Sequence, residues 1–175
     1  MFRRNLLTAL LPFVAAACDS QVGRISDSPA QAELAEVEAV LRALPQALED
    51  YDFNRLSDLF DPDLQWIEGG PPVPVEDLLK RFHASEAAQA IVDFGQLRDL
   101  KVEVENDFAW GTWLLDAAFT ADTDEGLEFL RAVFGTSDLS QRNWSMGFAE
   151  SAVLRKTDSG WRFVFGHTTP LPDGG

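Results

Sequence analysis

Apolar positions in the first part of the chain recur at spacings of three and four residues. They form one stripe, made of Leu34, Val37, Leu41, Leu44, Leu48 and Tyr51. This period predicts an amphipathic helix. Ser28, Pro29 and Gln31 form a capping-box pattern with proline at the first helical position, so the helix is expected to begin near Pro29. Pro45 falls inside the stripe and is expected to kink the helix or split it.

Shorter elements are expected between this helix and the middle of the chain. Asp52 or Asn54 can cap a second helix, and Pro74 can open a third one. The pattern predicts a helix to about residue 60, a turn at 61–63, a strand over 64–68 and a helix over 75–85.

The second half of the chain is rich in strand-forming residues. Strands are expected over 91–94, 96–105, 108–120, 144–156 and 161–169, with a short helix inside a polar insertion at 122–143. The last two strands form a hairpin around a turn rich in Asp, Ser and Gly. In the final strand Trp161, Phe163, Phe165 and His167 alternate with other residues, so they are expected to share one covered face.

Helices followed by antiparallel strands predict an α+β domain. We expect the N-terminal helices to pack on a strongly curved antiparallel sheet that forms a cone. The chain has 175 residues, of which 46% are hydrophobic, enough for the core of a single domain. It carries 14 basic and 29 acidic residues, so nucleic acid and anionic membrane surfaces are not expected as partners.

The first eighteen residues have the pattern of an export signal. Arg3 and Arg4 precede an apolar run over 6–14, and three alanines at 15–17 lead to Cys18, the one cysteine of the chain. This segment resembles a bacterial lipoprotein signal. The resemblance implies cleavage before Cys18, acyl chains such as palmitate on that cysteine, and a membrane anchor. An ordinary secretory signal and a twin-arginine signal are the alternatives.

The expected organisation follows from this leader. Residues 1–17 are a signal peptide, 18–28 the lipidated Cys18 and a tether, 29–171 the folded domain and 172–175 a tail. The protein is expected in the bacterial cell envelope, facing the periplasm or the exterior, on either the inner or the outer membrane. With its one cysteine lipidated, the mature chain has no intramolecular disulfide.

Three segments resemble the SnoaL-like branch of the nuclear transport factor 2-like superfamily. They are Tyr51 to Phe60, Asp107 to Thr112 and the terminal hairpin ending Gly160 to Thr169. The likeness covers roughly residues 33–170 and implies a cystatin-like α+β roll in which the curved sheet and the long helix enclose a conical pocket. Members often have a second histidine where this chain has Phe165, and the 122–143 insertion is longer than usual.

The resemblance and the strand parity together give candidate site residues. Tyr51, Trp66, Trp113 and His167 are expected to line the pocket and bind a ligand. His167 is the candidate catalytic base, assisted by Tyr51 or Asp116. Asp116, Glu150 and Arg155 are polar candidates on faces that the pattern leaves ambiguous. No cofactor and no metal site are expected, because the histidine and cysteine spacings of metal sites are missing from the sequence.

Three functions remain open at this stage. The first is a membrane-anchored binding or accessory domain that holds a small apolar ligand and can form a homodimer through its open sheet face. The second is a proton-transfer enzyme of the isomerase, cyclase or dehydratase type, with His167 as base. The third is a structural dimerisation module whose pocket is filled by its own aromatic residues. The polarity and filling of the cone distinguish them.

Overall fold

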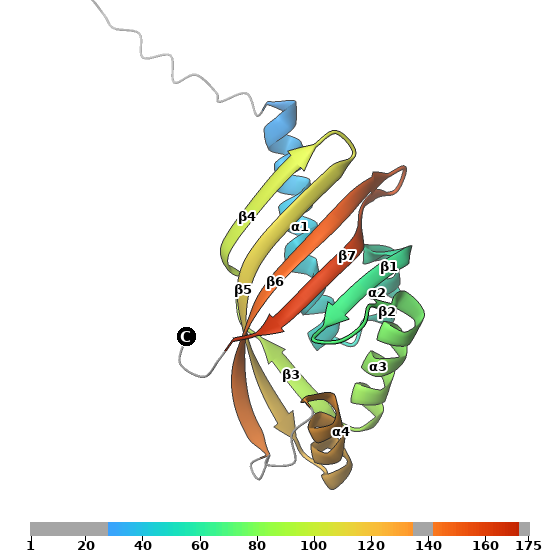
Figure 1. Ribbon diagram of the computed structural model, residues 1–175, viewed down its shortest axis with the longest axis vertical. Coiled ribbons are helices and arrows are strands. Elements are labelled where there is room, and N and C mark those ends of the chain that lie inside the picture. The colour runs from blue at the N-terminus through green and yellow to red at the C-terminus, as the bar shows by residue number, and fades with distance from the viewer. Residues whose placement is uncertain (1–27, 135–141, 172–175) are drawn as a thin grey trace, which may run out of the picture.

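The computed structural model describes residues 28–134 and 142–171 (Figure 1). The expected signal peptide, Cys18, most of the tether and the tail lie outside these residues. The described elements are α1 (Pro29–Glu49), α2 (Phe53–Leu59), β1 (Phe60–Glu68), β2 (Val73–Pro74), α3 (Val75–Ala87), β3 (Ala90–Phe94), β4 (Arg98–Glu105), β5 (Phe108–Ala121), α4 (Asp124–Phe134), β6 (Asn143–Thr157) and β7 (Gly160–Pro170).

The helix starts lie where their capping residues predict. Ser28 Oγ accepts from the N–H of Gln31 at 3.3 Å, and the Gln31 side chain accepts from the N–H of Ser28 at 3.0 Å. Asp52 caps α2 through a 3.0 Å bond from the N–H of Arg55. Pro45 does not split α1, which continues to Glu49. A proline removes one backbone donor, and the bonds of the neighbouring turns carry the helix past it.

The sheet has seven strands and is mixed. Its order is β2-β1-β7-β6-β5-β3, and β4 also pairs with β5. All pairs are antiparallel except β1 with β7, which are parallel. The expectation of a wholly antiparallel sheet is therefore wrong at this pair. Parallel pairing needs a long connection between its strands, and here the greater part of the domain lies between them.

Residues 61–63 belong to β1 and do not form the expected turn. Asp61 is only 3% exposed, and the pairing of β1 with β7 shifts register between Phe60 and Gln65. The Asp61 carboxylate accepts from the N–H of Asp63 at 3.1 Å and from the Arg155 guanidinium at 2.6 Å. A buried carboxylate satisfied in this way can be held inside a strand.

The helices α1, α2 and α3 cover one face of the curled sheet, which we call the inner face, and together they form a cup (Figure 1). Leu41 of α1 and Phe163 of β7 are fully buried in its core. A Cβ built on Gly111 of β5 would lie 2.9 Å from Cδ1 of Leu41, so α1 approaches the sheet closely there. The expectation that the N-terminal helices cover the last hairpin is confirmed at Phe163.

The final strand changes its facing at one residue. Phe163 pairs with Leu154 and Phe165 pairs with Val153, so Val164 is an extra residue in β7. Such a β-bulge shifts the alternation of side chains by one position. Trp161 and Phe163 point inward before the bulge, and Gly166 and Thr168 point inward after it. The expectation that Phe165 and His167 share the face of Phe163 is therefore wrong.

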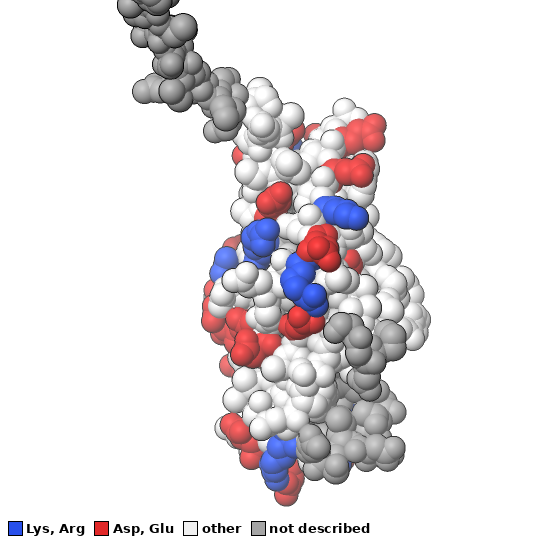
Figure 2. All heavy atoms as spheres, turned by 90° about the vertical axis from the view of Figure 1, so that its left-hand side faces the viewer, with Lys and Arg blue, Asp and Glu red and all other residues white. Residues whose placement is uncertain are grey.

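Charge on the side of the molecule along the left of Figure 1 is mixed in sign. Figure 2 shows basic and acidic side chains interspersed there, with uncharged surface between them. Arg98 of β4 and Asp116 of β5 form an exposed ion pair at 2.8 Å. This face is therefore not a uniformly acidic surface, although the whole chain has a formal net charge of −15.

Candidate functional site

Four residues on neighbouring strands form one row across the inner face of the sheet. Glu68 of β1 pairs with Thr168 of β7, Thr168 with Glu150 of β6, and Glu150 with Trp113 of β5. Residues paired in register across strands have their side chains side by side on the same face. We call the region around Glu68, Thr168 and Glu150 the mouth of the cup.

Two buried tryptophans support the mouth from below. Trp113 donates its indole N–H to Oε2 of Glu150 at 2.7 Å. Trp66 donates its own to Oγ1 of Thr168 at 3.1 Å, and that hydroxyl donates to Oε1 of Glu150 at 3.2 Å. Trp66 is 5% exposed and Trp113 is 3% exposed, whereas Glu150 and Thr168 are partly exposed. The carboxylate therefore lies at the boundary between the core and the solvent.

Burial raises the pKa of Glu150 to about 7. The hydrogen bonds from Trp113 and Thr168 act in the opposite direction, because they stabilise the charged form, while the negative charge of Glu68 raises the pKa further. Burial also raises the pKa of Glu68, against the lowering effect of Arg81. A carboxyl group that titrates near neutral pH can either accept or donate a proton under physiological conditions.

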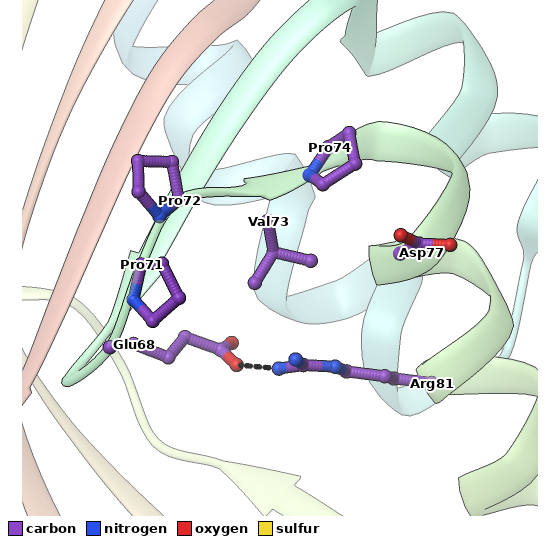
Figure 3. A pocket seen from close by; sticks show the side chains of 8 residues that line it. Glu68, Pro71, Pro72, Val73, Pro74, Asp77 and Arg81 are labelled. Carbon is purple, nitrogen blue, oxygen red and sulfur yellow. Dashed lines mark hydrogen bonds and ion pairs between the residues drawn. The ribbon is translucent and has the colours of Figure 1, made fainter.

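A hollow of about 250 Å³ adjoins the mouth on the side of Glu68. Figure 3 shows the Glu68 side chain reaching from β1 toward Arg81 of α3, with Pro71 and Val73 beside them. The two side chains form an ion pair at 3.0 Å. The side chain of Glu68 is 35% exposed. The hollow is thus open to solvent and carries both charged and apolar groups.

Trp66 and Trp113 are the expected pocket residues that the structure places in this site. Tyr51 lies elsewhere, because its hydroxyl donates to the carbonyl oxygen of Ala90 at 2.5 Å. Ala90 pairs with Ala121 at the far end of β5, beyond Trp113. The hydroxyl of Tyr51 therefore ties the end of α1 to β3 and does not reach the mouth.

His167 and Asp116 lie on the outer face of the sheet, opposite the cup. His167 pairs in register with Ser151, and its Nε2 is 3.3 Å from Oγ1 of Thr169. Asp116 is ion-paired with Arg98, and its side chain is 59% exposed. The expected position of His167 in the cup is therefore wrong, because of the bulge at Val164. Strand parity places Asp116, whose face the pattern left ambiguous, on the outer face. The structure does not bring His167, Tyr51 and Asp116 together.

Thr168 and Glu68 are site residues that the sequence pattern did not indicate, and Glu150 was only one of several polar candidates. A signal for Glu150 exists in β6. Phe148, Ala152 and Leu154 are buried at even positions, so Glu150 continues an otherwise apolar face. A charged residue in such a series is a reason to look for a partner on the neighbouring strands.

Across residues 28–134 and 142–171, no three or more His, Cys, Asp or Glu side chains are grouped so that they could hold a metal ion. In that same part of the chain, every helix is too short or too polar to span a bilayer.

Comparisons with known proteins agree with this geometry. The fold is an α+β roll with a strongly curled sheet, and the model of the SnoaL-like domain family matches residues 37–172. The chain belongs to this family. No curated protein matches the chain by sequence.

Several solved structures share the fold. A proposed dehydratase of the NTF2-like family from Streptomyces avermitilis has a TM-score of 0.64 at 21% identity, covering 81% of this chain and 98% of that one. A Caulobacter vibrioides protein with a cystatin-like fold has a TM-score of 0.59 at 15% identity, with coverages of 81% and 92%. The association domain of CaMKII from C. elegans has a TM-score of 0.57 at 17% identity, covering 80% of this chain and 97% of that one. At such identities the likeness shows the fold alone.

Proposed function

We propose that the protein is a bacterial envelope lipoprotein whose SnoaL-like domain binds a small molecule at the mouth of its cup. The leader and Cys18 support the membrane anchor, because the one cysteine of the chain stands where lipidation requires it. Glu150 is the main polar contact for the ligand. The family and the fold are consistent with small-molecule binding, and the particular site is our proposal.

The hydrogen-bonded carboxylate of Glu150 is the observation that carries this proposal. Trp66, Trp113 and Phe163 fill the bottom of the cup and leave the ligand its mouth. Ligand sites are typically apolar surfaces with a few well-placed polar groups. A partly exposed carboxylate held by buried tryptophans at the edge of the core fits that description.

Mass spectrometry of co-purifying small molecules tests the proposal. The wild-type chain and the Glu150→Gln variant would be purified side by side, with Glu103→Gln as the matched control. Glu103 is an exposed glutamate of β4 that faces away from the cup, and its loss changes the net charge by the same amount. Because Glu103 pairs with Trp110 on the outer face, the three proteins are compared in the same oligomeric state. We expect a compound retained by the wild type and by the control but depleted in Glu150→Gln. A compound retained equally by all three would place the binding site elsewhere.

Proton transfer is the second candidate function, with Glu150 in place of His167 as the acid or base. The specific observation in its favour is the pKa of about 7 on the inner face of the cup. An enzyme of this kind would exchange a carbon-bound proton next to a carbonyl for deuterium in heavy water. Exchange into a panel of ketones by the wild type, lost in Glu150→Gln and kept in Glu103→Gln, would establish it; equal exchange rates in all three would refute it.

The outer face of the sheet is our proposed contact for a homodimer. Phe108 and Trp110 of β5 lie on this face with exposed fractions of 49% and 38%. The similarity to an association domain of CaMKII is compatible with this proposal. Trp110→Glu should convert a dimer into a monomer in analytical ultracentrifugation. A wild-type chain that is monomeric at all concentrations would rule the dimer out.

A further inference from the structure

The hydrogen bonds around Glu150 run in a single direction. An indole N–H can only donate, so Trp66 donates to the Thr168 hydroxyl and Trp113 donates to Glu150. The hydrogen of Thr168 is then directed toward the other oxygen of Glu150. Each carboxylate oxygen accepts one bond from the wall of the cup. Their remaining lone pairs are the ones that a ligand at the mouth can use.

Glu150 has no cationic partner among the described residues. Its two partners, Trp113 and Thr168, are neutral. The charged groups near the mouth are Glu68 of β1, whose charge acts on Glu150, and Arg81 of α3, which is ion-paired with Glu68. A poorly solvated carboxylate with neutral neighbours is stabilised either by a proton or by a cation that binds to it.

We propose that the ligand of the mouth is an organic cation, a protonated amine that donates to the free lone pairs of Glu150. This inference rests on the proposed binding function and specifies its ligand class. Thr168 alone separates Glu68 from Glu150 in the row, and Glu68 borders the hollow. The apolar part of the ligand would therefore extend past Glu68 and lie against Pro71, Pro72 and Val73. A net charge of −15 raises the local concentration of cations around the protein.

Binding of an amine must compete with the proton on Glu150. The ammonium group binds the carboxylate form, so its affinity should rise with pH through the titration of Glu150, and binding should release a proton near neutral pH. Glu68 faces the same region from β1, and its negative charge also favours a cation. An anionic ligand would bind the protonated form instead, with the opposite dependence on pH.

Three probes of the same shape and different charge test the ligand class. They are benzylammonium, benzyl alcohol and benzoate, each added at millimolar concentrations to the mature chain labelled with nitrogen-15. The readout is the indole N–H signal of Trp113, which bonds directly to Glu150, assigned with a Trp113→Phe variant. We expect a saturable shift with benzylammonium, tighter at higher pH, and at least about tenfold weaker binding of the other two.

Glu150→Gln separates charge from shape at the same position. The amide oxygen can accept from Trp113, and the amide nitrogen can donate to the second lone pair of Thr168, while the hydrogen of the partly exposed Thr168 hydroxyl turns to solvent. This variant should lose benzylammonium binding by about tenfold or more, and Glu103→Gln should keep it. The indole signals of the variants show in the same spectra whether each is folded. Thr168→Ser, which keeps the hydroxyl, should retain binding as a second check.

The outcomes distinguish this inference from the proposed function. Equal or tighter binding of benzyl alcohol or benzoate at the Trp113 signal would overturn the cation and leave small-molecule binding in place. Benzylammonium that binds equally to the wild type and to folded Glu150→Gln would also overturn it. Failure of all three probes to shift the signal would count against both proposals.

Discussion

Gly166 lies directly beneath the indole ring of Trp66. A Cβ built on Gly166 would lie 2.1 Å from Cε3 and 2.3 Å from Cζ3 of that ring. No side chain fits in this space, so the glycine allows the tryptophan to lie against the backbone of β7. The same contact brings the indole N–H within 3.1 Å of Thr168. The geometry of the mouth therefore depends on a position that has no side chain.

Gly166→Ala should destabilise the protein by about 1–3 kcal/mol, because the Trp66 ring must move out of a packed core. The displacement should also break the bond from Trp66 to Thr168. Urea unfolding measures the first effect, and the indole N–H shift of Trp66 measures the second. Gly70→Ala is the control, since a Cβ there meets nothing within 4 Å. Equal stability of the two variants would show that the ring is not confined by Gly166.

Stability should fall as pH rises through the titration of Glu150. In the folded protein the Glu150 carboxyl group keeps its proton up to about pH 7, whereas an unperturbed glutamate releases its proton near pH 4.5. The unfolded state therefore binds fewer protons over this interval, and the free energy of unfolding should decrease by up to roughly 3 kcal/mol. Urea unfolding at several pH values should show this slope in the wild type and in Glu103→Gln. A slope that persists unchanged in Glu150→Gln would assign it to other groups.

Arg155→Met should cost about 3 kcal/mol, because it removes the cation that is hydrogen-bonded to the buried carboxylate of Asp61 and leaves only the more distant charge of Arg162. Burial raises the pKa of Asp61, but the N–H of Asp63 and the guanidinium of Arg155 outweigh it, so the pKa is lowered overall. Arg98→Met breaks the exposed pair with Asp116 and should cost less than about 1 kcal/mol. Thermal or urea unfolding compares the stability of the two variants. A smaller loss of stability for Arg155→Met than for Arg98→Met would contradict a stabilising role of the pair between Asp61 and Arg155.

The proposed lipid anchor predicts that Cys18→Ser releases the protein from membranes, because Cys18 is the one thiol of the chain and directly follows the expected leader. Cell fractionation and labelling with palmitate measure the two consequences. Ser20→Ala, two residues further along the chain, is a control that should stay with the membrane. Label incorporated into the Cys18→Ser protein would exclude the lipoprotein assignment.

Local signals in the sequence were sufficient for the helices and the last hairpin. Ser28 and Asp52 begin their helices as their side chains predict, because capping is a contact within one turn. The turn before Gly160 likewise places β6 and β7 side by side. These elements depend on residues that are close together along the chain.

The site could not be predicted in full, because it depends on pairing between residues that are far apart in the sequence. Asp61 was expected in a turn because Asp, Pro and Asp at 61–63 are turn-forming residues, and its partner Arg155 lies far away along the chain. His167 was expected in the cup because the side chains of the last strand were assumed to alternate without interruption. The residue types around Val164 do not indicate a β-bulge. Glu150 gains its importance only when β5 and β7 are placed beside β6.

The extra residue at Val164 reverses which side chains of the last strand face the cup. Every side chain after it is presented to the other side of the sheet, so the cup receives a hydroxyl from Thr168 while the imidazole of His167 is left outside. Removing one residue would exchange the two without altering either of them. The inventory of chemical groups available to a ligand is thus set by the length of a strand as much as by its composition.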